Sequence, residues 1–90
     1  MLINLASFEY SKVIDRERLG ARVISPRFED RDASGRPRIV SFYAKRARGT
    51  MAGWLVRNRV RTASHLSDFD GDGYAFDEAR STRDEPVFVR

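Results

Sequence analysis

Cysteine is absent from this 90-residue chain, and histidine occurs only once. Without cysteine the protein can form neither disulfides nor thiolate metal sites. The sequence also lacks a run of the roughly 20 apolar residues that a transmembrane helix needs. No basic region precedes its short apolar N-terminus, as one does in a secretory signal. We therefore expect a cytoplasmic protein that contacts no membrane and whose length permits one small hydrophobic core.

Lysine is also scarce, because 15 of the 17 basic residues are arginine. The net charge is +4, and a hydrophobic fraction of 41% is typical of a globular chain rather than a disordered one. A basic chain attracts anionic partners at long range, and the planar guanidinium group suits phosphate or carboxylate. The composition favours contact with nucleic acid or nucleotides, with a merely soluble basic surface as the alternative.

Apolar periodicity predicts an α+β fold with a short mixed sheet, a β-hairpin and one main amphipathic helix. The expected strands span residues 2–6, 22–29, 38–42, 74–77 and 86–89, and the expected helices span residues 8–14 and 43–60. Pro26 indicates an edge position or a bulge in the second strand. The first strand is apolar on both faces and needs neighbours that this chain barely supplies. We therefore expect an incomplete part of a larger α+β domain.

The main helix has an apolar stripe with a period of 3.6 residues. The stripe consists of Ala44, Ala47, Met51, Trp54 and Leu55. Gly49 and Gly53 lie inside the pattern and each cost up to about 1 kcal/mol relative to alanine. They indicate either close approach of another backbone or a break near Gly49. Asn58 falls on the stripe by phase, so we expect a buried amide that holds a strand edge, caps the turn or faces a polar cleft.

The acidic loop at residues 67–73 resembles the first half of an EF-hand, but the match fails. Asp68, Asp70, Asp72 and Gly73 have suitable spacing, whereas the twelfth position, which requires a bidentate glutamate, is Ala79. We therefore expect a solvated turn and no metal site. His65 has no recognisable nucleophile or acid partner in its neighbourhood, and the sequence holds no phosphate-binding or dinucleotide-binding glycine motif. The sequence therefore identifies no catalytic residue and no cofactor, and an enzyme whose active residues lie on a missing segment stays open.

The strongest local signal is cationic. Arg46 and Arg57 project from the helix side opposite the stripe, Lys45 and Arg48 flank the stripe, and Arg59 and Arg61 follow at the helix end. Such cations can cover a core with their aliphatic stems or complement the helix dipole. They can equally contact a phosphate backbone. The predicted nucleic-acid-binding set is Lys45, Arg46, Arg48, Arg57, Arg59 and Arg61.

Three segments resemble the peroxide stress protein YaaA family: NLASFEY at residues 4–10, SFYAKRARGTM at residues 41–51, and GYAFD at residues 73–77 followed by the strand at Val87 and Phe88. The resemblance runs from residue 2 to residue 90. It implies that residues 1–90 are a single C-terminal segment of a larger domain whose N-terminal two-thirds, with the family's Ser-Pro-Ala-Lys motif, are absent. It also implies a bacterial protein of the oxidative-stress response, associated with limiting free iron and Fenton damage, with a basic cleft and DNA binding.

By their position in the family motifs, the further cleft candidates are Asn4, Ser7, Glu9 and Tyr10. The leading hypothesis is a DNA-binding protein of the peroxide stress response. The alternative is an enzyme that acts on a phosphorylated or nucleotide-like small molecule, with its site completed by the missing N-terminal region. The segment offers poor ligands for iron, so any effect on free iron is expected to be indirect.

Overall fold

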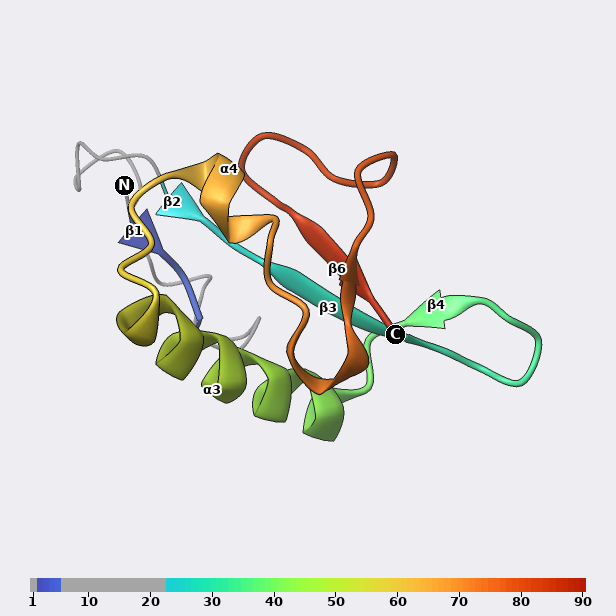
Figure 1. The fold of residues 1–90 in the computed structure, drawn as a ribbon. Helices are drawn as coiled ribbons and strands as arrows, with labels where there is room; N and C mark the ends of the chain where they lie inside the picture. The colour runs from blue at the N-terminus through green and yellow to red at the C-terminus, as the bar shows by residue number, and fades with distance from the viewer. Residues whose placement is uncertain (1, 6–22) are drawn as a thin grey trace.

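The computed structural model describes residues 2–5 and 23–90 (Figure 1). Its main sheet has four strands in the order β4-β3-β6-β5, and a two-stranded parallel sheet pairs β1 with β2. The strand bounds are β1 Leu2–Ile3, β2 Val23–Ile24, β3 Arg27–Arg31, β4 Pro37–Arg38, β5 Ala75–Phe76 and β6 Val87–Val89. The helical elements are α3 Ser41–Arg57, α4 Ala63–Leu66 and the 3₁₀ turn η1 Gly71–Gly73. The fold is therefore α+β with one main helix, as predicted.

The central strand β3 has a parallel neighbour and an antiparallel one. It pairs antiparallel with β4, which closes the predicted hairpin, and parallel with β6. The parallel pairing requires a crossover, and the chain between β4 and β6 provides one that contains α3. The last two strands, β5 and β6, lie within the predicted ranges and pair antiparallel.

Pro26 separates β2 from β3 without ending the hydrogen bonding along this stretch. The backbone N–H groups of Ser25 and Arg27 donate to the carbonyl oxygens of Asp84 and Pro86, each at 2.8 Å. Because alternate residues donate to the same neighbouring segment, the missing N–H of Pro26 costs no bond there. The predicted strand at residues 22–29 is thus two short strands joined at the proline.

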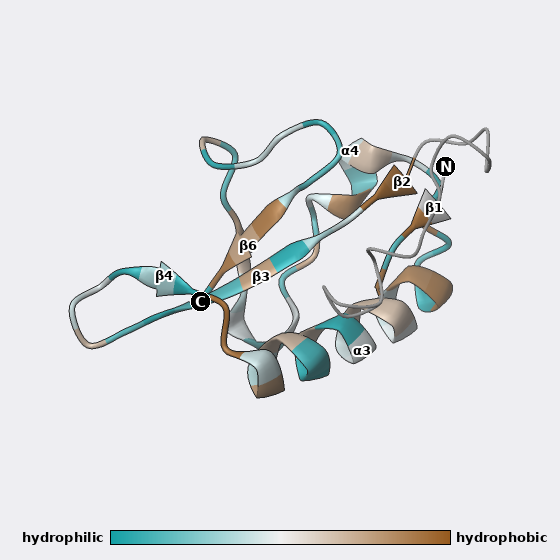
Figure 2. Cartoon of the chain, turned by 180° about the vertical axis from the view of Figure 1, so that it is seen from behind, coloured by the Kyte–Doolittle hydropathy of each residue, from teal (hydrophilic) through white to brown (hydrophobic). Residues whose placement is uncertain are grey.

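Helix α3 packs across one face of the sheet and provides much of the core (Figures 1 and 2). Its buried residues are Ala44, Ala47 and Met51. Phe28 of β3 stacks with Phe88 of β6 at a ring-centroid distance of 5.4 Å. The rest of the buried cluster comprises Ile24, Leu66, Phe69 and Tyr74, with Trp54 and Leu55 packed against it. The predicted apolar stripe is confirmed.

The predicted strand at residues 38–42 is wrong beyond Arg38. The carbonyl oxygen of Val40 accepts a bond of 2.8 Å from the N–H of Ala44, so the helix begins at Ser41. Only Asp30 and Arg31 of β3 face partners in β4, and the chain must then turn to place Ala44 against the sheet. The alternation of apolar residues at this point indicated a strand, but packing of the helix prevails.

Two expectations about the helix interior are also wrong. A side chain added at Gly49 would meet no atom within 4 Å, and α3 continues through both glycines without a break. At Gly53 the neighbouring group is the side chain of Arg57 rather than another backbone. Asn58 is exposed, because the helix ends before this position can face the core. Its Nδ2 donates to the carbonyl oxygen of Trp54 at 2.9 Å, which confirms the capping role.

The side chain of Asp32 organises the loop of the hairpin. Its Oδ1 accepts hydrogen bonds from the N–H and Oγ of Ser34 and from the N–H of Arg36, at 2.6–3.0 Å. The bond from the Ser34 hydroxyl contributes most to lowering the pKa of Asp32 below its usual range, followed by the bond from the Arg36 backbone. Gly35 adopts a φ of +84°, which glycine tolerates without strain. The predicted turn is therefore built on local hydrogen bonds.

Within the described residues, no helix is long and apolar enough to cross a membrane.

Candidate nucleic-acid interface

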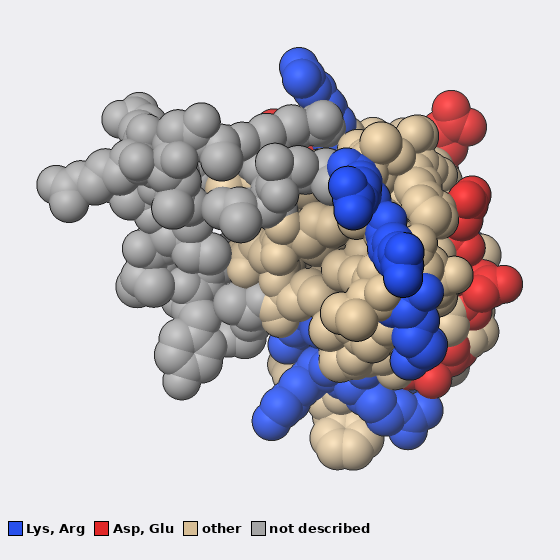
Figure 3. Space-filling model, turned by 60° about the vertical axis from the view of Figure 1, so that its left-hand side comes forward, with Lys and Arg blue, Asp and Glu red and all other residues tan. Residues whose placement is uncertain are grey.

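Charge is distributed very unevenly along the chain. Residues 33–67, which include α3 and α4, contain eight lysine or arginine residues and no acidic residue. Residues 68–90 contain seven acidic and three basic residues. In Figure 3, basic side chains follow one another over one part of the surface, and most of the visible acidic side chains lie along the right-hand edge. The linear separation of charge is thus also a spatial separation on this face.

Helix α3 carries four of the six predicted phosphate-binding residues: Lys45, Arg46, Arg48 and Arg57. Lys45, Arg46 and Arg57 are exposed, whereas Arg48 is half-buried. Arg46 and Arg57 are eleven positions apart, close to three helical turns, so they share the outer face at an axial separation of about 17 Å. The helix dipole is positive at the N-terminal end of α3 and disfavours cations there, so it gives no reason for Lys45 and Arg46. No acidic residue occupies the first turn to offset it.

Arg46 differs from the other cations because it faces an aspartate. Its Nε lies 3.8 Å from Oδ2 of Asp72, and Thr50 Oγ1 donates to the same oxygen at 3.0 Å. The pair is exposed, so its contribution to stability is small. Nevertheless, it ties η1 to α3 and partly neutralises Arg46. Arg46 is therefore the weakest member of the predicted set.

The remaining two predicted residues, Arg59 and Arg61, directly follow the helix and are exposed. The N–H of Arg59 donates to Val56 O at 3.3 Å, and the N–H of Val60 donates to Leu55 O at 3.2 Å. These two bonds form a Schellman motif, whose left-handed position is usually glycine. Here that position is Arg59, with a φ of +50°. An arginine thus stands where the backbone conformation favours glycine.

Five of the six predicted cations have no acidic partner among the described residues. Within residues 2–5 and 23–90, no ion pair is formed by Lys45, Arg48, Arg57, Arg59 or Arg61. Within the described part of the chain, no carboxylate neutralises their charge. We call these five residues the open cations.

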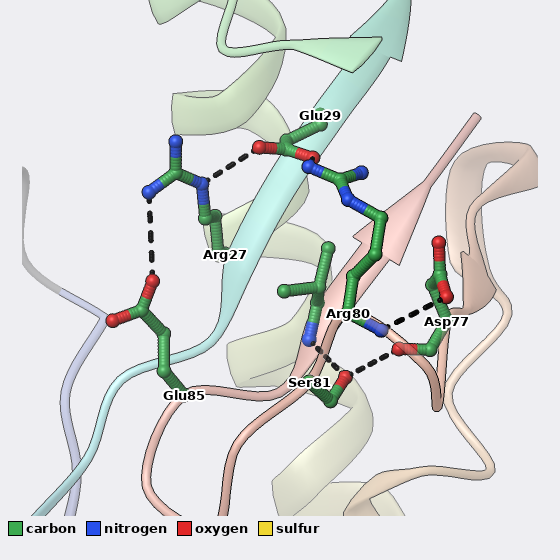
Figure 4. A network of polar contacts seen from close by, with 7 residues as sticks. Arg27, Glu29, Asp77, Arg80, Ser81 and Glu85 are labelled. Carbon is green, nitrogen blue, oxygen red and sulfur yellow. Dashed lines mark hydrogen bonds and ion pairs between the residues drawn. The ribbon is translucent and has the colours of Figure 1, made fainter.

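Arginines that contact the sheet are, in contrast, held by carboxylates (Figure 4). Glu29 of β3 is the only buried charged residue among those described, at 2% exposure. Its Oε2 accepts from Arg27 Nε at 2.7 Å, and its Oε1 lies 2.5 Å from Arg80 Nη2, in a contact whose geometry is that of an ion pair rather than a hydrogen bond. Arg27 also reaches Glu85 at 3.5 Å. Two arginines thus compensate one buried carboxylate.

A second paired arginine, Arg90, joins the last strand to the hairpin and to η1. Its Nε donates to Asp30 Oδ1 at 2.6 Å, and its Nη1 donates to the carbonyl oxygen of Asp72 at 3.0 Å. The guanidinium group also lies 4.7 Å from the ring centre of Tyr74 and 5.0 Å from that of Tyr43. The hydrogen bond to Asp30 raises the pKa of Arg90. This arginine is committed to the fold.

Of the four cleft candidates, the structure describes only Asn4. Asn4 is half-buried, its N–H donates to Ile24 O at 2.7 Å, and its Nδ2 donates to Ser25 Oγ at 3.3 Å. These bonds give Asn4 a structural role beside the junction of β1 and β2. Ser7, Glu9 and Tyr10 lie outside the described residues, as does the predicted helix at residues 8–14.

The acidic loop packs into the core through one aromatic residue, while Asp68, Asp70 and Asp72 are exposed, as expected of a solvated turn. Among the described residues, no three His, Asp or Glu side chains gather as they would around a metal. Phe69 of this loop is buried in the core, and Asp72 takes a φ of +56°, which aspartate tolerates. His65 lies in the short helix α4, which Thr62 caps through a bond from the His65 N–H at 3.2 Å. Its ring contacts Trp54 edge-on.

Sequence reasoning missed the division of the arginines into paired and open groups. One signal was available, because the open cations come from a stretch without acidic residues. The pairing of Glu29 gave only part of such a signal, since Arg27 lies two residues before it on β3, whereas Arg80 reaches it from the loop between β5 and β6.

Comparison with known proteins relates the sequence of this chain to a family. The family model described as "Peroxide stress protein YaaA" matches residues 1–80. A UPF0246 protein of Marinomonas sp. (strain MWYL1) is 47% identical over 90 residues, which cover 100% of this chain and 34% of the relative. A UPF0246 protein of Cupriavidus metallidurans is 54% identical over 89 residues, which cover 99% of this chain and 34% of the relative. The chain thus spans about a third of the length of the curated relatives it matches.

Proposed function

This chain belongs to the peroxide stress protein YaaA family, and from that premise we propose that it serves the peroxide stress response by binding DNA. The binding surface consists of the five open cations, and its ligand is the phosphate backbone. Because the curated relatives are about three times as long as the matched segment, we also propose that the chain is the C-terminal portion of such a protein. The rest of that protein then contributes further contacts.

The observation that carries this proposal is the lack of acidic partners around the open cations. Surface arginines that only stabilise a fold are satisfied by nearby carboxylates, as Arg27, Arg80 and Arg90 are. The open cations instead stand together in a stretch with no acidic residue. Cations that neutralise phosphates release condensed counterions from DNA, which supplies much of the binding free energy.

Arg59 adds a second argument, which concerns the backbone. A non-glycine residue in the left-handed conformation costs roughly 1–2 kcal/mol. Such strain persists at positions where the side chain serves a function. We propose that Arg59 is retained at the helix end because its guanidinium group contacts a phosphate.

The proposed binding has little sequence preference. The open cations present point charges and guanidinium forks suited to phosphate oxygens. Reading of bases requires an element seated in the major groove, and we assign no such role to α3. Any limitation of free iron would then be indirect, with protection of bound DNA as the immediate effect.

The test is fluorescence anisotropy of a labelled DNA duplex titrated with this chain at several salt concentrations. The logarithm of affinity should fall with the logarithm of salt concentration, with a slope of about −0.9 for each phosphate contacted. The double variant Arg57→Glu/Arg61→Glu should lose at least about tenfold in affinity, since it exchanges two attractive charges for two repulsive ones. The matched control is Arg31→Glu/Arg36→Glu, which changes the net charge equally at two exposed positions outside the surface.

Equal losses in both double variants would reduce the effect to net charge and contradict a localised surface. No binding at low salt by the folded chain would exclude the DNA proposal. Saturable binding of a nucleotide with only mild dependence on salt would instead favour the alternative, an enzyme acting on a phosphorylated small molecule.

A further inference from the structure

An apolar surface lies on the outer side of α3, away from the sheet. Phe42 is 70% exposed and Val56 is 79% exposed. Each is seven residues from Gly49, and seven residues are close to two turns, so the three positions share one face of the helix. We call Phe42, Gly49 and Val56 the outer stripe. Figure 2 shows hydrophobic segments at both ends of α3, consistent with a large apolar residue at each end of the stripe.

Because Gly49 has no side chain, the helix surface is lower at the middle of the stripe than at its two ends. A side chain at this position would meet nothing within 4 Å, so the packing of the described residues gives no reason for glycine. Glycine is unfavourable inside a helix relative to alanine, and small residues on a helix surface allow another element to approach closely. The surface therefore has the shape of a shallow saddle between Phe42 and Val56.

Further apolar side chains are exposed just before the helix and in its first turn. Ile39, Val40 and Tyr43 are 47%, 38% and 42% exposed, and the rings of Phe42 and Tyr43 contact each other edge-on at 5.8 Å. Single exposed apolar residues are ordinary on protein surfaces. Several exposed apolar residues on one helix and the residues just before it are instead typical of a contact site.

We infer that the outer stripe is the docking surface for the rest of a family-length chain. The match covers this chain over 100% of its length and the Marinomonas relative over only 34%, so such a protein has two further thirds to pack. In this arrangement an apolar element of those two-thirds lies along α3, with Phe42 and Val56 at its ends and Gly49 beneath it. This inference does not depend on DNA binding.

Charge argues against a second copy of this chain as the occupant. The outer stripe is bordered by Lys45, Arg46 and Arg57, and residues 33–67 include no acidic side chain. Two copies meeting through α3 would bring like charges together, which opposes association. A different segment can instead bring neutral residues to the same border, which leaves Lys45 and Arg57 without an acidic partner.

The test uses a chimera in which this chain replaces the matching segment of the Marinomonas relative. Val56→Asp should lower the melting temperature of the chimera by more than about 5 °C, because burial of an unpaired carboxylate is costly. The control is Ala33→Asp, at an exposed position in the hairpin loop. Because Val56 is 79% exposed within this chain, Val56→Asp in this chain alone measures the cost of a carboxylate near the helix C-terminus. A larger loss in the chimera then arises from contacts with the remainder.

Gly49→Gln provides a second and independent readout. It should leave the melting temperature of this chain alone unchanged or raised, since glutamine is the better helix former and the position is open. In the chimera the same change should lower the melting temperature, because the side chain would collide with the docked element. A rise in both contexts, or equal behaviour of Val56→Asp and Ala33→Asp, overturns the inference. A dimeric chimera that Val56→Asp converts to monomer also overturns it, in favour of a second copy.

Discussion

Arginine has two different environments in this molecule, one at the sheet and one at the far end of α3. At the sheet, Arg27 and Arg80 hold the buried carboxylate of Glu29, and Arg90 joins Asp30 to two aromatic rings. At the end of α3, Arg57, Arg59 and Arg61 form no ion pair with any described carboxylate. The same residue type therefore stabilises the fold in one region and leaves charge available in the other.

The difference shows why the count of basic residues is a poor guide to function. A net charge of +4 indicates attraction to anions in general, but it does not say which cations are available. Around the sheet, substitution of an arginine leaves a carboxylate without its cationic partner. At the end of α3, substitution of an arginine leaves no described carboxylate unpaired. Fold stability and anion binding should therefore respond to different substitutions.

The largest expected effect on stability is at Arg80. Arg80→Met leaves Oε1 of the 2%-exposed Glu29 without its cation. Breaking a fully buried pair costs about 3–5 kcal/mol; since Arg80 is 42% exposed, screening reduces this, and we expect about 2 kcal/mol. Urea denaturation followed by Trp54 fluorescence measures it. The control from the other region is Arg61→Met, which should change stability by less than about 0.5 kcal/mol. Equal losses would remove the distinction between the two regions.

A smaller effect is expected at Tyr74, whose hydroxyl donates to Asp30 at 2.8 Å within the network of Arg90. Tyr74→Phe should cost about 1.5 kcal/mol near neutral pH, since the acceptor is charged. Tyr43→Phe is the control, because Tyr43 contacts the same guanidinium group without a described hydrogen bond from its hydroxyl.

The same tyrosine should make stability depend on alkaline pH. Burial, followed by the bond to Asp30, raises the pKa of Tyr74 from 10.0 to about 12. Because the folded-state pKa is the higher one, the neutral form is favoured by folding. Its stabilisation is complete below pH 10 and is lost as the pH rises towards 12. Denaturation curves of the wild type and Tyr74→Phe should therefore converge across this window, and parallel curves would contradict the assigned bond.

Prediction from sequence succeeded where the local pattern and the tertiary packing agree. The apolar stripe of α3 was correct because Ala44, Ala47 and Met51 recur at helical spacing and all face the sheet. The strand at residues 38–42 was wrong because an alternating apolar pattern cannot reveal that Ala44 must already face the core. The predicted burial of Asn58 was wrong for a related reason, because helical periodicity predicts the orientation of a side chain only as far as the helix extends.

The binding surface could be predicted only in part. The cations of α3 were visible in the sequence, but the pairing of Arg46 with Asp72 joins positions 26 residues apart and depends on how η1 packs. No sequence period encodes such a contact. The outer stripe was overlooked because glycines in a helix were expected to meet another backbone, whereas Gly49 faces open space.

The smallest expected effect, and the one that separates the two regions most cleanly, is at Arg59. Arg59→Gly relieves the left-handed conformation at a φ of +50° and should stabilise the fold by about 1 kcal/mol. The same change removes one proposed phosphate contact, so affinity for DNA should fall and the salt slope should decrease in magnitude by about 0.9. Arg59→Lys controls for charge, since it keeps both the strain and the cation. The free energy of unfolding in urea should therefore rise while the affinity for DNA falls, and only Arg59→Gly should show this combination. If Arg59→Gly instead destabilised the chain, the side chain would be contributing to the fold, and Arg59 would belong with the paired arginines of the sheet.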